Sequence, residues 1–226
     1  MSDNHYELGI LGGMGPEATS DLYKRIINHT KASSDQDHIK MVILNNCDTP
    51  DRTKALLGDG PSPLPALNHG IQTLSSLGCK YFVIPCNTAH AYSDKFWKRT
   101  KMQFISMIDA VIEELKGNYS DKKICVLCTN GSRDAGIYEN KGIEINYPAS
   151  QDKVMSVITN TKAGIYDLNT LQEVITEEEK NYDVFILACT ELSLYKDKLE
   201  TSGEILDAMD ELVRKVIKLC GKEYKK

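Results

Sequence analysis

The sequence predicts an α/β protein built from two pseudo-symmetric domains with mainly parallel sheets, and three observations support this fold class. Short apolar runs that end in glycine, asparagine or threonine alternate with segments of helical period, which is typical of parallel strands joined by crossover helices. The two halves of the chain repeat this order, with similar motifs at the strand ends. The 226 residues are enough for two domains of about 100 residues each, although one large domain also fits.

The first half contains four expected strands and two clear helices. The strands are expected at the short apolar runs 7–11, 40–45, 81–84 and 103–107. The helix expected at 16–29 opens on proline and repeats apolar residues at every fourth position, Ala18, Leu22 and Ile26. A second helix stops at Gly78 and should bury one face that carries Leu67, Ile71, Leu74 and Leu77.

The second half restarts the same order. A strand is expected at 123–127, turn and helix signals follow at 129–137, and a strand at 183–187 closes the repeat. The segment 204–226 is expected to be a long amphipathic helix with Ile205, Met209, Leu212, Val213, Val216, Ile217 and Cys220 on its apolar stripe. We therefore expect a first domain at 1–106, a second at 107–203, and a C-terminal helix 204–226 that returns to the first.

Composition and charge exclude several classes of partner. The net charge is −5 and the basic residues are scattered apart from the tail 222–226, so no basic face for nucleic acid is expected. The N-terminal segment lacks the basic head and apolar stretch of a signal peptide, and no apolar run approaches the ~20 residues of a membrane span. Seven cysteines at irregular spacings predict reduced thiols in a cytoplasmic protein, and no metal site is indicated.

Two cysteines occupy equivalent places in the repeat. YFVIPCNT and VFILACT each place a strand before a cysteine and a threonine, so Cys86 and Cys189 should lie at the carboxyl ends of strands, where open α/β sheets bind ligands. A free cysteine alone is usually a small buried hydrophobic residue, but a matched pair favours chemistry. The N–H groups at a helix start stabilise a thiolate and are expected to lower the thiol pKa.

Two opposed thiols across an interdomain cleft suit proton transfer at the α-carbon of an amino acid. One group removes the proton, and the other returns a proton to the opposite face of the planar carbanion. Preorganised donors must then hold the enediolate charge. The candidates for these donors are Asn87, Thr88, Thr190 and the segment 129–132, which includes Thr129.

Four motifs together resemble the aspartate/glutamate racemase family over nearly the whole chain. They are GILGGMGPEAT with Met14, NNCDTPDRT with Arg52, PCNTAH at 85–90, and LACTE at 187–191. The resemblance implies two pseudo-symmetric α/β domains, an active site in the cleft between them, no pyridoxal phosphate or metal cofactor, and a homodimer. By position, Cys86 and Cys189 match the catalytic cysteines of the family. Some relatives have threonine at the first position, so the presence of both cysteines favours a racemase that works in both directions.

The resemblance also implies a substrate. Arg52 and Lys162 match family positions that hold the side-chain carboxylate, and Met14 matches a substrate-binding position, so aspartate or glutamate is the expected substrate. His90 lies one turn after Cys86 and is interpreted as a packing or capping residue rather than as a base. Glu191 is interpreted as a supporting residue that orients a donor or binds the substrate amine.

The sequence also has features that are typical of other functions. The segment 13–18 matches the dinucleotide motif G-x-G-x-x-A, but the following strand ends in asparagine about 30 residues later, where an acidic residue about 20 residues away is required. Cys125 and Cys128 form a C-x-x-C, but residues three apart in a strand point to opposite faces. A dicarboxylate isomerase or malonate decarboxylase of the same superfamily, or a non-catalytic small-molecule binding protein, would use part of the same site.

Overall fold

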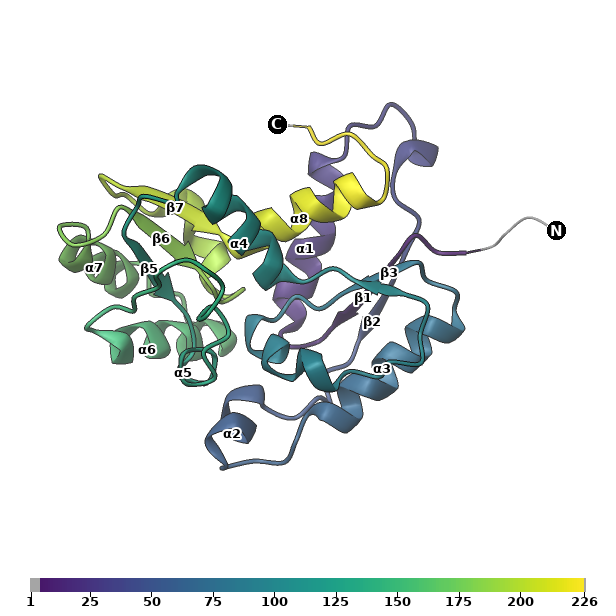
Figure 1. Ribbon diagram of the computed structural model, residues 1–226, viewed down its shortest axis with the longest axis horizontal. Coiled ribbons are helices and arrows are strands. Elements are labelled where there is room, and N and C mark those ends of the chain that lie inside the picture. Colours follow the sequence, from purple (N-terminus) through teal and green to yellow (C-terminus); the bar gives the residue numbers. More distant parts are fainter. Residues whose placement is uncertain (1–4, 226) are drawn as a thin grey trace.

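The structure is a computed structural model that describes residues 5–225, and it contains two parallel sheets surrounded by helices (Figure 1). The first sheet has the order β2-β1-β3-β4 and the second has the order β5-β6-β7. These strands are β1 (Leu8–Gly12), β2 (Met41–Asn45), β3 (Tyr81–Val83), β4 (Gln103–Phe104), β5 (Ile124–Leu127), β6 (Val184–Leu187) and β7 (Glu204–Asp207). The predicted α/β class with two parallel sheets is confirmed.

The helices follow the strands as crossover connections. They are α1 (Pro16–His29), α2 (Arg52–Leu57), α3 (Leu64–Ser76), α4 (Met107–Asn118), α5 (Asn130–Asp134), α6 (Gln151–Lys162), α7 (Leu168–Glu178) and α8 (Ala208–Leu219). Three 3₁₀ segments complete the described chain: η1 (Asp35–Asp37), η2 (Asn87–Lys95) and η3 (Leu192–Lys198). Within residues 5–225, no helix combines the length and the apolar character that a membrane crossing requires.

The two sheets are built on the same plan. β3 is flanked by β1 and β4, and β6 is flanked by β5 and β7, so each half has a central strand with its parallel neighbours in the same chain order. The edge strand β2 has a reduced counterpart in the second half, where Asn146 forms a parallel bridge with Cys125 of β5. Cys86 and Cys189 each follow the central strand of a sheet, which places them at equivalent points.

A single apolar cluster connects the halves. It contains Leu8 and Val83 from the first sheet, Val126 and Ile186 from the second, and Leu212 of α8, all fully buried. In Figure 1, α8 lies between the sheets beside α1 and α4, and it contacts both helices. The C-terminal helix therefore packs on α1 of the first half, and it also packs on α4.

Two details of the predicted elements were wrong. Residues 204–207 do not belong to the C-terminal helix but form β7, because Ile205 and Leu206 complete the second sheet beside β6 and Asp207 caps the start of α8. An apolar pair followed by an amphipathic stripe is compatible with either structure, so the pattern did not separate them. Leu77 is 42% exposed rather than buried, since α3 has already ended at Ser76.

Candidate active site

A narrow cavity lies where β3 and β6 end, and both halves of the chain line it. Its volume is about 10 Å³, and it shares residues with an adjoining outer cavity of about 230 Å³. The residues around the inner cavity are Met14, Asp51, Arg52, Thr53, Cys86, Asn87, Thr88, Thr129, Lys162, Cys189, Thr190 and Glu191. All nine site residues predicted from the sequence are in this group.

The glycine-rich turn after β1 forms one wall of the cavity. Gly13 has φ +88°, and a Cβ at this position would lie 2.4 Å from the backbone carbonyl carbon of Asn46, so only glycine fits. Its N–H donates to Oγ1 of Thr19 at 2.9 Å. The packing of this turn against the end of β2 and the start of α1 accounts for its glycine without a bound dinucleotide.

Arg52 is buried at the start of α2, where Asp51 caps the helix by accepting a hydrogen bond from the backbone N–H of Lys54. The guanidinium donates to the carbonyl oxygens of Thr49, Pro50 and Met14 at 3.3, 3.2 and 3.0 Å. Its Nε is buried and has no hydrogen-bond partner among the described residues. A buried donor without a partner is costly, so this atom is suited to an anionic ligand.

Neighbouring side chains of the cavity stabilise the positive charge of Arg52. Burial lowers the pKa of the guanidinium, but the neighbouring Cys86, Asp51 and Glu191 outweigh burial and raise the pKa overall. Arg52 is therefore a permanent cation in contact with one of the two thiols.

Asn87 supplies a second unpaired donor. Tyr138 donates its hydroxyl to Oδ1 of Asn87 at 2.5 Å, which fixes the side-chain amide and leaves Nδ2 buried without a partner among the described residues. Next to it, the hydroxyl of Thr88 lies 3.0 Å from those of Thr129 and Ser132. The amide and the hydroxyls form the group of donors that the sequence predicted beside Cys86.

Cys189 has a different environment from Cys86. Its Sγ donates to Oε2 of Glu191 at 2.9 Å, and Oγ1 of Thr190 lies 3.3 Å from the same carboxylate oxygen. Burial and, next, the Glu191 carboxylate raise the pKa of the Cys189 thiol well above its usual value. The expected lowering by a helix start is wrong for Cys189, because burial and a neighbouring negative charge dominate.

Lys162 ends α6 at the mouth of the cleft and lines both cavities, although its side chain remains exposed to solvent. The loss of surrounding water lowers the pKa of its ammonium group, but Glu191 and the two thiols outweigh this effect and raise the pKa. Two cations, Arg52 and Lys162, thus belong to one cavity.

His90 is a structural residue, as its predicted packing or capping role requires. Its Nδ1 donates to the carbonyl of Cys86 at 2.9 Å, and its Nε2 accepts the N–H of Met107 at 3.1 Å. Burial lowers the pKa of the ring to about 4, so it is neutral. With both nitrogens bonded to the backbone, the ring is not available as a base for the Cys86 thiol.

The second cysteine pair is also structural. Cys125 packs in the cluster formed with α6 and α7, whereas Cys128 packs in the cluster that contains α4 and α8, so the two lie on opposite faces of the β5 segment. Burial raises the pKa of the Cys128 thiol to about 12. The prediction that these two cysteines point in opposite directions is confirmed.

Two residues of the cavity, Asp51 and Thr53, were not predicted from the sequence, and neither was the support that Tyr138 gives to Asn87. Asp51 could have been found from its position as a helix-capping residue directly before Arg52. Nothing in the sequence indicates the contact between Tyr138 and Asn87, because these residues come from different halves of the chain.

Comparison with known proteins identifies the family of the chain. A family model described as Asp/Glu/Hydantoin racemase matches residues 11–216. The chain is 34% identical to the aspartate racemase of Picrophilus torridus, whose structure superposes with a TM-score of 0.87 over 97% of this chain and 96% of that one. It is 27% identical to the broad specificity amino-acid racemase RacX of Bacillus subtilis, over 89% of this chain and 92% of the relative.

A more distant structure supports the fold alone. Glutamate racemase from Francisella tularensis, solved in complex with D-glutamate, has a TM-score of 0.63 at 16% identity and covers 96% of this chain and 81% of that one. The family model spans most of the sequence, including both cysteine motifs and the turn with Met14. The chain belongs to the Asp/Glu/hydantoin racemase family.

Proposed function

We propose that this protein racemises an acidic amino acid, aspartate or glutamate, and that Cys86 and Cys189 exchange the α-proton without pyridoxal phosphate or a metal ion. One observation carries the proposal: the two cysteines line a single cavity together with Arg52, Asn87 and Lys162. Two of these three residues have buried donors without partners among the described residues. The family resemblance also supports a homodimer, and the reduced thiols expected from the cysteine spacing support a cytoplasmic location.

The roles of the residues follow from their charges. We assign the side-chain carboxylate of the substrate to Arg52 and Lys162, because a guanidinium fork and a second cation favour an acidic side chain. The α-carboxylate is assigned to the donors of Asn87, Thr88 and Thr129. These donors would hold the negative charge that moves onto the carboxylate when the α-proton leaves.

Each proton transfer has one donor and one acceptor among the two thiols and the α-carbon. The Cys86 thiolate takes the α-proton, and the electron pair of the C–H bond moves into an enediolate. The Cys189 thiol then gives its proton to the opposite face of the α-carbon, and its charge remains as a thiolate beside Lys162. The raised pKa of Cys189 keeps it protonated as an acid before substrate binds. Turnover in the other direction uses the thiols in reversed roles.

The test is to incubate the protein in D₂O with each enantiomer of aspartate and glutamate, without pyridoxal phosphate, and to follow α-proton exchange and optical rotation together. We expect exchange with racemisation for at least one of the two amino acids. Cys86→Ala and Cys189→Ala should each lower racemisation by roughly 100-fold or more, because each variant lacks one of the two acid/base groups. Cys47→Ala is the matched control, since Cys47 is exposed and does not line the cavity.

Two outcomes contradict the proposal. Racemisation at the wild-type rate in either cavity variant would exclude a mechanism with two thiols. The absence of exchange and racemisation with all four substrates would favour the dicarboxylate isomerase, malonate decarboxylase or binding-protein alternatives.

A further inference from the structure

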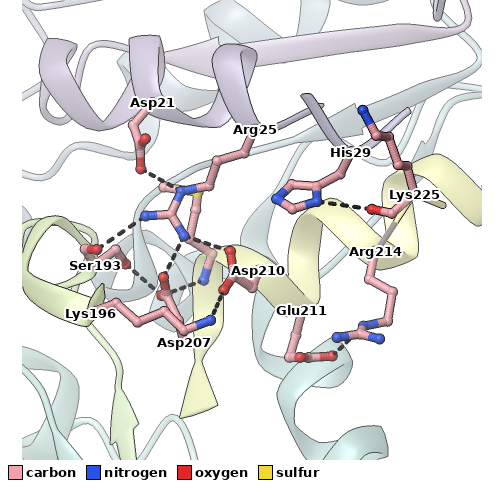
Figure 2. A network of polar contacts seen from close by, with 11 residues as sticks. Asp21, Arg25, His29, Ser193, Lys196, Asp207, Asp210, Glu211, Arg214 and Lys225 are labelled. Atoms are coloured by element: carbon pink, nitrogen blue, oxygen red, sulfur yellow. Dashed lines mark hydrogen bonds and ion pairs between the residues drawn. The ribbon is translucent and has the colours of Figure 1, made fainter. Parts of the chain in front are cut away.

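A polar cluster joins the two halves of the chain next to the segment that carries Cys189 (Figure 2). We call it the Arg25 cluster, and it comprises Asp21, Arg25, Ser193, Lys196, Asp207 and Asp210. None of these residues lines the candidate active site.

Arg25 is the centre of the cluster. Its Nη1 bonds to Oδ2 of Asp207 at 2.7 Å and to Oδ1 of Asp210 at 2.5 Å. Its Nη2 donates to the carbonyl oxygen of Ser193 at 3.1 Å, and its Nε bonds to Asp21 one turn earlier in α1 at 2.8 Å. Figure 2 shows the guanidinium of α1 reaching both the Ser193 segment and the start of α8. One side chain of the first half thus contacts three residues of the second.

Asp207 connects Arg25 to the segment that carries Cys189. Its carboxylate is fully buried, and Oδ1 accepts bonds from Oγ of Ser193 at 2.6 Å and from the N–H of Met209 at 3.0 Å. In the second sheet Asp207 is paired with Leu187, two residues before Cys189. Ser193 lies four residues after Cys189, so the cluster holds the chain on both sides of the thiol.

The segment after Cys86 in the first half makes different contacts from the segment after Cys189. His90 lies four residues after Cys86, as Ser193 does after Cys189, and it connects the Cys86 carbonyl to the N–H of Met107 at the start of α4. That connection uses a neutral ring and reaches the start of α4. Ser193 connects instead to a buried carboxylate.

A buried carboxylate needs a counterion, and here the other half supplies it. Burial raises the pKa of the Asp207 carboxyl, while Arg25 opposes the increase. Lys196 pairs with Asp210 rather than with Asp207, so Arg25 is the cation that bonds directly to Asp207 in the described chain. The Arg25 cluster therefore ties the chain on both sides of Cys189 to α1 of the first half through a buried ion pair, and His90 gives Cys86 no ion pair of this kind.

We propose that Arg25 is a positioning residue for Cys189: through Asp207 and Ser193, it fixes the second thiol opposite the first. This inference rests on the proposed racemase function and adds a residue outside the substrate cavity. Substrate binding, assigned to Arg52 and Lys162, does not pass through the cluster. Loss of Arg25 should therefore lower kcat more than it raises KM.

The two thiols allow a test that separates positioning from general damage. In D₂O, Cys86 alone can remove the α-proton of one enantiomer, exchange it with solvent and return a deuteron to the same face of the carbon. This gives exchange with retention of configuration. Inversion requires the proton from Cys189. A displaced Cys189 should therefore lower racemisation while exchange persists in the enantiomer that Cys86 deprotonates.

The experiment measures kcat, KM and the ratio of α-proton exchange to racemisation for both enantiomers in wild type, Arg25→Lys and Arg25→Met. For Arg25→Met we expect kcat for racemisation to fall about 100-fold, the scale of a small misplacement of a catalytic group, with KM within about 3-fold. The exchange-to-racemisation ratio should rise at least about 10-fold for one enantiomer only. Arg25→Lys should recover part of the racemisation, because it keeps a cation near Asp207 but loses the bond to Ser193.

The matched control is Lys153→Met. It removes a cation that has two carboxylate partners, Glu173 and Glu177, in an exposed group of three residues within the second half. It should leave the ratio unchanged. If Arg25→Met does not fold, the double variant Arg25→Gln/Asp207→Asn removes both charges of the buried pair and receives the same measurement.

The outcomes separate the two proposals. A wild-type protein that neither exchanges nor racemises refutes the proposed function and this inference with it. A wild type that racemises, with Arg25 variants in which exchange and racemisation fall in proportion for both enantiomers, refutes the inference alone.

Discussion

At the scale of single residues, the two thiols of the cavity have opposite electrical neighbours. Cys86 lies beside the Arg52 cation, whereas Cys189 donates to the Glu191 carboxylate. In the proposed mechanism one thiol starts each turnover as the acid, and the raised pKa of the Cys189 thiol, caused by burial and then by the Glu191 carboxylate, suits Cys189 to that role. The two thiols therefore start from different surroundings, although both take part in either direction of the proposed reaction.

Arg52 is also the residue that should select an acidic side chain. Arg52→Ala removes the guanidinium with its unpaired Nε. The kcat/KM for aspartate or glutamate should therefore fall by roughly 10- to 100-fold, which corresponds to the free energy of a hydrogen bond to a charged group. The amide analogues asparagine and glutamine, if they react, should lose much less. The measurement is racemisation of each pair by polarimetry, with Lys54→Ala on the exposed side of α2 as control. An equal loss for acid and amide would remove Arg52 from the specificity of the site.

At the scale of elements, His90 connects η2 to the start of α4, and this connection should make stability depend on pH. The folded pKa is about 4 and the unfolded value is 6.5, so the unfolded chain binds a proton that the folded chain excludes. The contribution of the neutral ring is complete above about pH 6.5, and it decreases as the pH falls towards about 4. The loss across this window should be about 3 kcal/mol.

The check is urea unfolding of wild type and His90→Gln at about pH 7.5 and about pH 4. The variant should be less stable at the higher pH, because it loses the two backbone bonds of the ring. It should then lose about 3 kcal/mol less than the wild type on acidification. The same loss in both proteins would show that other groups set the acid sensitivity.

Helices and strands were predictable from the sequence where the residue pattern fits only one type of secondary structure. The strand before Cys86 is an unbroken apolar run, and the helix with Ala18, Leu22 and Ile26 repeats apolar residues at every fourth position; the structure contains both. Strand β7 was missed because four residues with an apolar pair continue the helical stripe of α8 equally well. A short strand of this kind is determined by its neighbours in the sheet rather than by its own residues.

The candidate site was predictable in its members but not in its contacts. Strand ends identified Cys86 and Cys189, and matching to family positions identified Arg52 and Lys162. The sequence did not indicate Arg25, because a charged residue in a surface helix is usually solvated. Its partners come from the other half of the chain, and only the packing of α1 against α8 brings them together.

At the scale of the whole molecule, the two halves share helices as well as a cavity. α4 and α8 follow the last strand of each sheet and contact each other, and each has a capping side chain, Ser106 or Asp207. The repeated pattern thus gives two equivalent strand ends for the thiols and two equivalent helices that hold the halves together. A cleft between such halves keeps a fixed spacing only while these helices stay packed.

This arrangement predicts that the halves unfold together. Leu212 of α8 is fully buried in the apolar cluster that includes residues of both sheets, so Leu212→Ala should cost about 3 kcal/mol. The loss should appear equally in the fluorescence of Trp97, which reports the first half, and in the hydrogen exchange of the β6 amides in the second. Leu57→Ala, at a position that is 47% exposed, should change either readout by less than about 1 kcal/mol. If the two probes gave different transitions, the halves would be independent units, and positioning of Cys189 by Arg25 would depend on a mobile contact.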